Sequence, residues 1–183
     1  MTPEADLAAF LAQREQTQVV EVDQPQVQLV VFTLGGDVFA LRGGQVKEVL
    51  SAQQAVFALP GQDQSVEGVL TLRGQLYPVW QAESLLGLSV TSSPGEGAFQ
   101  AALLLCQARV DEQQQAVVLR VGSLMDVIDL SEDRLQPPSS SLISTLGAQA
   151  EAVFEWQGQG VTLLDLHALM QDWWQRRAGA QTA

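Results

Sequence analysis

The chain has 183 residues, 46% of them apolar, so it can bury one or two compact cores and is predicted to be folded. Its 21 acidic and 9 basic residues give a formal net charge of -12, which repels phosphate backbones and anionic lipid and so excludes nucleic acid as an expected partner. The same charge favours protein partners that carry basic patches.

The single cysteine, Cys106, lies in an apolar run and is interpreted as a core residue. One cysteine excludes a disulfide within the chain and a cysteine-cluster metal site. Glu4 and Asp6 stand where a secretory signal needs positive charge, and no apolar run reaches the roughly 18 residues of a membrane span. We therefore expect a cytoplasmic protein without direct membrane insertion.

Residues 1–27 are predicted to form a short helix followed by a linker. Thr2 and Pro3 form a helix start, and three apolar side chains then share one face: Leu7, Phe10 and Leu11. A helix this short is marginal alone, so we interpret it as docked on its own domain, with a partner-binding arm as the alternative.

Short strands and turns follow from residue 28. Residues 29–34 are apolar on both parities, as in a strand buried on two sides, and Gly35-Gly36 turns the chain into residues 38–41. Further strands are predicted over residues 45–50 and 55–59. The chain then forms a hairpin from Val66 to Trp80, with Arg73-Gly74 at its tip and Pro78 confining the return to an edge or a strand start.

The second half repeats this plan after a polar stretch, Thr91 to Gly97, which we take as the boundary between two small barrels. A short helix precedes this boundary and ends at Gly87. Strands are predicted over residues 101–106, 116–121 and 124–130, and a hairpin over residues 153–164. Asp165 then caps a helix whose apolar stripe is Leu166, Leu169, Met170, Trp173 and Trp174.

Catalytic machinery is not expected. The only histidine, His167, lies off the apolar stripe and is interpreted as a solvated helix residue, and no Gly-x-Ser-x-Gly elbow is present. The only lysine, Lys47, lacks the flanking residues of a phosphate-binding loop. The acidic residues of the stretch 126–133 fit a solvated turn better than a metal loop. We therefore predict a protein that is not an enzyme and has no cofactor or metal.

The hairpin sequence Gly68-Val69-Leu70-Thr71-Leu72-Arg73-Gly74, followed by Pro78-Val79, resembles the signature of the CheW family, the adaptor that couples chemoreceptors to the CheA histidine kinase. Three further blocks agree in order and spacing: Leu29 to Ala40, Val46 to Val49 and Gly160 to Leu166. The resemblance covers about residues 28 to 170.

This resemblance implies a mainly β fold of two SH3-like five-stranded β-barrels with short helices and a C-terminal amphipathic helix. The CheW-like domain would span residues 28–177, with the first barrel at 28–90, the second barrel and helix at 98–177, and a tail at 178–183. The implied partners are a methyl-accepting chemoreceptor and a CheA-type histidine kinase. The implied receptor-binding residues are Arg73, Leu72, Gly74, Val46, Glu48, Val49, Leu104 and Leu105.

Alternatives stay open at this stage. Arg73 can equally be a solvated turn arginine, and the apolar residues of the implied site can be plain core. Thr71 stands where the family usually has Asn, Gln81-Ala82-Glu83 replaces Asp-Leu-Arg, and Arg120 replaces a frequent acid. These departures leave room for a divergent scaffold that no longer binds the kinase, or for a small β-barrel enzyme. The sequence names neither the receptor nor the pathway, whether swimming, twitching or another output.

Overall fold

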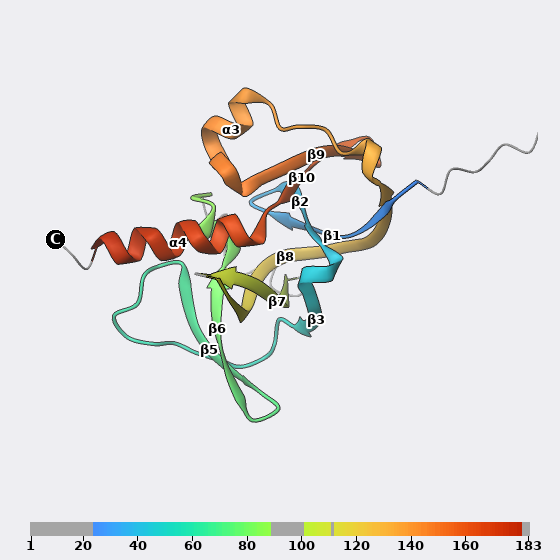
Figure 1. Ribbon diagram of the computed structural model, residues 1–183. Coiled ribbons are helices and arrows are strands. Elements are labelled where there is room, and N and C mark those ends of the chain that lie inside the picture. Colours follow the sequence, from blue (N-terminus) through green and yellow to red (C-terminus); the bar gives the residue numbers. More distant parts are fainter. Residues whose placement is uncertain (1–23, 89–100, 111, 181–183) are drawn as a thin grey trace, which may run out of the picture.

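The computed structural model describes residues 24–88, 101–110 and 112–180, which form a mainly β structure with a few short helices and one longer C-terminal helix (Figure 1). The elements are β1 (Gln26–Leu34), β2 (Asp37–Arg42), β3 (Val46–Ser51), β4 (Val56–Phe57), β5 (Val66–Leu72), β6 (Gln75–Gln81), α2 (Ala82–Leu85), β7 (Ala101–Val110), β8 (Gln113–Ser131), α3 (Ser140–Leu146), β9 (Ala150–Trp156), β10 (Gln159–Leu164) and α4 (Leu166–Ala180). The single-turn 3-10 helices are η1 (Gly43–Gln45), η2 (Glu132–Arg134) and η3 (Gly147–Gln149).

The strands form two sheets that share one long strand. Sheet A has the order β8-β1-β2-β10-β9, and sheet B has the order β3-β7-β8-β6-β5-β4. Residues 124–131 of β8 pair with β1, whereas residues 113–123 pair with β7 and residues 118–120 with β6. The single strand β8 therefore runs from one sheet into the other.

The two halves of the chain exchange hairpins. Sheet A joins the β1–β2 hairpin of the first half to the β9–β10 hairpin of the second half, through the parallel pair Val38–Val161. Sheet B joins β7 and β8 to the β5–β6 hairpin through the equivalent parallel pair Val79–Val118. The repeated strand plan is thus present, but the predicted division into a barrel at 28–90 and a barrel at 98–177 differs from how the strands pair.

A glycine in β8 explains why one strand can serve both sheets. A side chain at Gly122 would place its Cβ 2.6 Å from the Thr33 carbonyl oxygen of β1, so only glycine allows this close approach. The adjacent Ser123 N–H donates to Thr33 Oγ1 at 2.9 Å. The sequence analysis predicts two strands here, at residues 116–121 and 124–130, whereas the structure has the single strand β8 with Gly122 between them.

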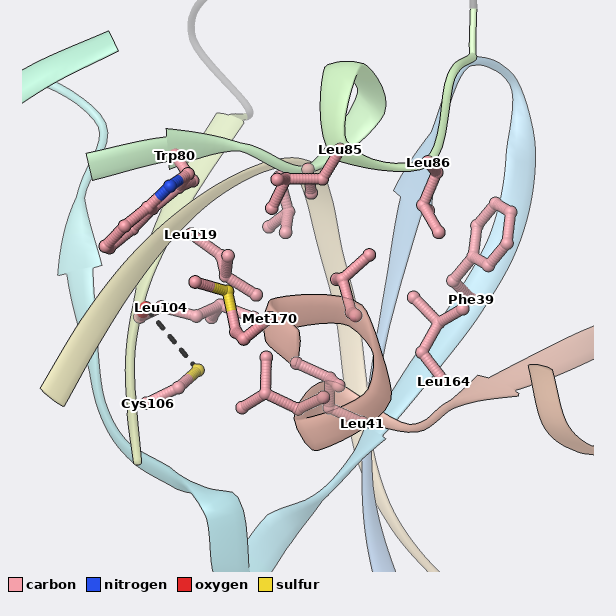
Figure 2. Packing of buried hydrophobic residues seen from close by; sticks show 14 of the residues in the cluster. Phe39, Leu41, Trp80, Leu85, Leu86, Leu104, Cys106, Leu119, Leu164 and Met170 are labelled. Carbon is pink, nitrogen blue, oxygen red and sulfur yellow. Dashed lines mark hydrogen bonds between the residues drawn. The ribbon is translucent and has the colours of Figure 1, made fainter. Parts of the chain in front are cut away.

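Helix α4 fills the space between the sheets. Asp165 caps it, since its Oδ1 accepts from the Ala168 N–H at 3.0 Å, as predicted. Figure 2 shows Met170 with Leu104, Cys106 and Leu119 of sheet B on one side and Phe39, Leu41 and Leu164 of sheet A on the other. Smaller clusters lie within each sheet, around Leu163 in sheet A and around Leu70 in sheet B.

Most of the predicted stripe on α4 is buried. Leu166, Leu169, Met170 and Trp173 have at most 8% of their surface exposed, whereas Trp174 is 42% exposed, contrary to its predicted place on the stripe. The Trp173 indole N–H donates to the buried Ser65 Oγ at 3.1 Å, and the Trp173 and Trp80 rings pack in a T-shaped pair with centroids 5.6 Å apart. Trp173 therefore anchors α4 to the loop before β5.

One helix was not predicted. Residues 137–139 are irregular, and Ser139 then caps α3, its Oγ accepting from the Leu142 N–H at 3.3 Å. The serine before Leu142 and Leu146 is the signal that could have revealed this helix.

We expect Leu169→Ala to lower the free energy of unfolding by about 2–5 kcal/mol, because it leaves a cavity between α4 and both sheets. Leu76→Ala is the matched control. Leu76 is 69% exposed, so the same change there is expected to cost less than about 0.5 kcal/mol. Denaturant unfolding of the three proteins checks this, and equal losses in both variants would contradict the packing of α4.

Cys106 provides a second check on the core. Burial raises the pKa of its thiol to about 12, so the thiolate is scarce at pH 8 and the sulfur is shielded. We expect a thiol-specific reagent to leave the folded protein unmodified and to label one thiol per chain once denaturant is added. Fast labelling of the folded protein would contradict the burial of β7 beneath α4.

Candidate protein-interaction surface

The β5–β6 hairpin forms as predicted, with a two-residue turn at Arg73-Gly74. Leu72 pairs with Gln75, and φ is +50° at Arg73 and +79° at Gly74, the positive pair that a type I′ turn requires. Pro78 pairs with Val69 of β5 on one side. The pairing of β6 with β8 on the other side begins only at the next residue, Val79. Pro78 therefore lies on the edge portion of the strand, as predicted.

Arg73 projects from this turn, with 74% of its side chain exposed. Its Nη2 donates to Glu48 Oε1 of β3 at 3.0 Å, which ties the hairpin tip to the neighbouring strand. An exposed pair of this kind contributes about 0–1 kcal/mol to stability. A guanidinium has five N–H donors, so one bond to Glu48 leaves donors for another carboxylate.

The predicted site residues fall into three groups: exposed, half-buried and buried. Glu48, Arg73 and Gly74 lie on the surface together with Val49, which is 45% exposed. We call these four residues the Arg73 surface. Val46 and Leu72 are half-buried at its border, where they pack against the central cluster and the sheet B cluster.

Leu104 and Leu105 are not on this surface. Leu104 pairs with Val49 and Leu105 with Glu48, so both lie on the strand next to the surface, but they are 0% and 8% exposed. The run 101–106 is apolar on both parities because β7 is covered on two faces. We therefore leave both leucines out of the surface available to a partner.

A second exposed surface was not predicted from the sequence. Phe57, Val69 and Pro78 form one row across β4, β5 and β6, on the side of these strands away from Leu70 and Val56. Phe57 is 60% exposed, and two further exposed apolar residues lie close to the row in sequence, Leu59 at 42% two residues after Phe57 and Leu76 at 69% two residues before Pro78. We call these five residues the β4–β6 face. The signal was present in β5, where Val69 and Leu70 place apolar side chains on both faces.

Glycine again permits the close approach of strands. A Cβ at Gly68, where φ is +155°, would lie 2.2 Å from the Phe57 carbonyl oxygen. The short strand β4 can therefore lie against β5 only with glycine at this position. This contact holds Phe57 in the β4–β6 face.

The departures from the family pattern have structural partners. Arg120 pairs with Glu67, its Nη2 donating to Oε1 at 2.7 Å, and both side chains are half-buried. Glu83 accepts from the Gly35 N–H at 2.9 Å and so links α2 to the β1–β2 turn. The Gln81 side chain caps no backbone N–H at the start of α2, and its Oε1 instead accepts from the Ser84 hydroxyl at 3.3 Å.

The described residues do not assemble a cluster of metal ligands. His167 is exposed, as predicted, and its Nδ1 accepts from the Arg109 backbone N–H at 2.7 Å, so that nitrogen is occupied within the fold. Within these residues, no three His, Cys, Asp or Glu side chains converge as metal ligands. None of the described helices combines the length and the apolar character needed to cross a membrane.

The turn at Arg73 leads to a prediction about stability. Asn is favoured over Arg at this turn position, so Arg73→Asn is expected to relieve backbone strain of about 0.5–1 kcal/mol. The same change removes the ion pair with Glu48, so the net gain in stability is smaller by the contribution of that pair. Gln157-Gly158 forms an equivalent turn in β9–β10, with φ of +51° and +74°, and Gln157→Asn is the matched control.

Denaturant unfolding is expected to show that Gln157→Asn gains stability and that Arg73→Asn gains less or is neutral. A loss of more than about 1 kcal/mol in Arg73→Asn alone would mean that the Arg73–Glu48 pair is a structural requirement of the fold.

Comparison with known proteins agrees with this geometry. A solved structure of the scaffolding protein CheW from Thermoanaerobacter tengcongensis matches with a TM-score of 0.67 at 20% sequence identity, covering 82% of this chain and 92% of that one. No curated protein matches the sequence. The family model of the CheW-like domain matches residues 28–173. The chain, with its two hairpin-exchanged sheets, therefore belongs to the CheW-like domain family.

Proposed function

We propose that this protein is a chemosensory adaptor that couples a methyl-accepting chemoreceptor to a CheA-type histidine kinase in the cytoplasm, by protein–protein contact and without catalysis or a cofactor. The observation that carries the proposal is Arg73, an exposed arginine held at positive φ on a hairpin tip. Asn or Gly would fit this turn with less strain, so the arginine is retained at a cost to stability.

The Arg73 surface is the proposed receptor contact. It combines a cation with spare donors and an apolar neighbour, Val49, which together suit a helix carrying a carboxylate beside apolar side chains. Glu48 holds the guanidinium over β3 before the partner arrives, so less side-chain freedom is lost on binding.

The β4–β6 face is the proposed contact with the kinase. Its apolar residues carry no charge, and three of them, Phe57, Val69 and Pro78, form one row of sheet B, which suits an apolar surface of another folded domain. The alternative is a scaffold that has kept the receptor contact and lost the kinase. The two surfaces share no residue, so variants of each can distinguish these functions. The adaptor and the alternative scaffold would each serve a chemotaxis or a twitching-type motility pathway.

The experiment measures receptor and kinase binding separately for two variants. We expect Arg73→Ala to weaken receptor binding by about 2 kcal/mol, roughly 30-fold, and to leave kinase binding unchanged. Arg73→Lys keeps the charge but loses the planar fork, so it is expected to restore only part of the affinity. Phe57→Ser is expected to show the reverse pattern, with weaker kinase binding and unchanged receptor binding.

Gln157→Asn, the equivalent turn position in the other hairpin, serves as the control that leaves both complexes intact. Receptor affinity unchanged in folded Arg73→Ala would remove Arg73 from the contact. Capture of the receptor without any kinase by the wild-type protein would establish the alternative scaffold.

A further inference from the structure

The second half of β8 presents an open strand edge. Residues 124–131 pair with β1 on one side, and within the described ranges no strand pairs with the other side. Met125 and Val127 are 41% and 49% exposed, and Asp126 and Asp129 are exposed as well. An exposed strand edge of this length is a template for pairing with another chain.

The hydrogen bonds at this strand define which backbone groups face outward. The Glu132 N–H donates to the Pro25 carbonyl at 3.0 Å, on the β1 side. The Val127 N–H instead donates to the side chain of its neighbour Asp126, at 2.8 Å. Successive residues of an antiparallel ladder alternate, so the N–H groups of Val127, Asp129 and Ser131 point to the open edge.

Acidic side chains decide what can occupy this edge. Pairing β8 with the same strand of a second copy would crowd Asp126 and Asp129 of both chains into one short ladder, and like charges opposed across strands are destabilising. The surroundings are acidic too. Residues 24–45 and 124–165, which build sheet A, contain eight acidic residues and two arginines. A basic partner is therefore favoured over a second copy of this chain.

We propose that residues 126–131 of β8 bind an extended segment of a partner protein by β-strand addition, and that this segment carries two apolar residues flanked by basic ones. The order along β8 sets this pattern, because Asp126 and Asp129 enclose Val127 and Ile128. Each basic side chain meets a carboxylate and each apolar one meets an aliphatic neighbour across the ladder. The Asp126 carboxylate accepts the hydrogen bond of the Val127 N–H. When a basic side chain of the partner pairs with this carboxylate, the Val127 N–H is released to bond the partner backbone.

The probe is an acetylated and amidated peptide, Thr-Lys-Val-Val-Lys-Thr, added to the isotope-labelled full chain and followed by NMR. The register peptide Thr-Val-Lys-Lys-Val-Thr has the same composition and charge, but cannot place lysines opposite both aspartates. A third peptide carries N-methyl groups on both valines, which blocks backbone pairing and keeps the charge.

We expect only the first peptide to bind in the millimolar range or tighter, with slowed exchange of the Val127 and Asp129 amides and little change at Ile128 and Leu130. The double variant Asp126→Asn/Asp129→Asn is expected to weaken binding about tenfold. Asp133→Asn/Glu155→Gln removes the same charge from exposed positions outside β8 and is expected to keep the affinity. Arg73→Ala is also expected to keep it, which separates this site from the proposed receptor contact.

Binding that tolerates N-methylation, binding that weakens equally in both double variants, or no binding at millimolar peptide would each overturn the proposal. Slower hydrogen exchange of the Val127 and Asp129 amides at higher protein concentration, without peptide, would also overturn the proposal. The strand edge would then be paired with a second copy of this chain.

Discussion

The shared strand β8 is the constraint on which the rest of the structure depends. Its residues enter the ladders of both sheets, and Gly122 allows it to pass within contact of Thr33 where it changes sheets. The sheets cannot separate without breaking β8 or the exchanged hairpins. The Arg73 surface and the β4–β6 face on sheet B therefore keep a fixed position relative to the open edge on sheet A. Partners that bind these surfaces would be held in a defined arrangement, which is what a scaffold needs.

Helix α4 completes this arrangement from the core side. Leu169 and Met170 pack in a cluster that takes residues from both sheets, and Trp173 extends the contact to Ser65 before β5. The interior between the sheets is close-packed, so a shift of one sheet would have to displace α4. We infer that adaptation to partners occurs in exposed side chains such as Arg73, which a weak ion pair leaves adjustable.

Local signals in the sequence predicted the elements better than their partners. The Arg73-Gly74 turn and the Asp165 cap were predicted because each depends on a few neighbouring residues. The exchange of hairpins was missed because strand pairing over long distances leaves no local trace, and β8 was predicted as two strands, at residues 116–121 and 124–130. Burial of Leu104 was also undetermined, since an apolar run does not show which residues a second layer covers. The resemblance to CheW identified the family, whereas exposure decided which implied residues reach the surface.

Charge separates the surfaces in a way that affects how they bind. Residues 46–81 and 101–123, which build sheet B, contain five acidic and four basic residues, against eight and two in the segments that build sheet A. Most of the net charge in these segments therefore lies on sheet A, whose field reaches about 8 Å into physiological salt. Association at the open edge of β8 would depend strongly on ionic strength, whereas a partner on the uncharged β4–β6 face would bind through apolar area that salt barely weakens. A change in ionic strength would then alter binding at the β8 edge and leave binding at the β4–β6 face nearly unchanged.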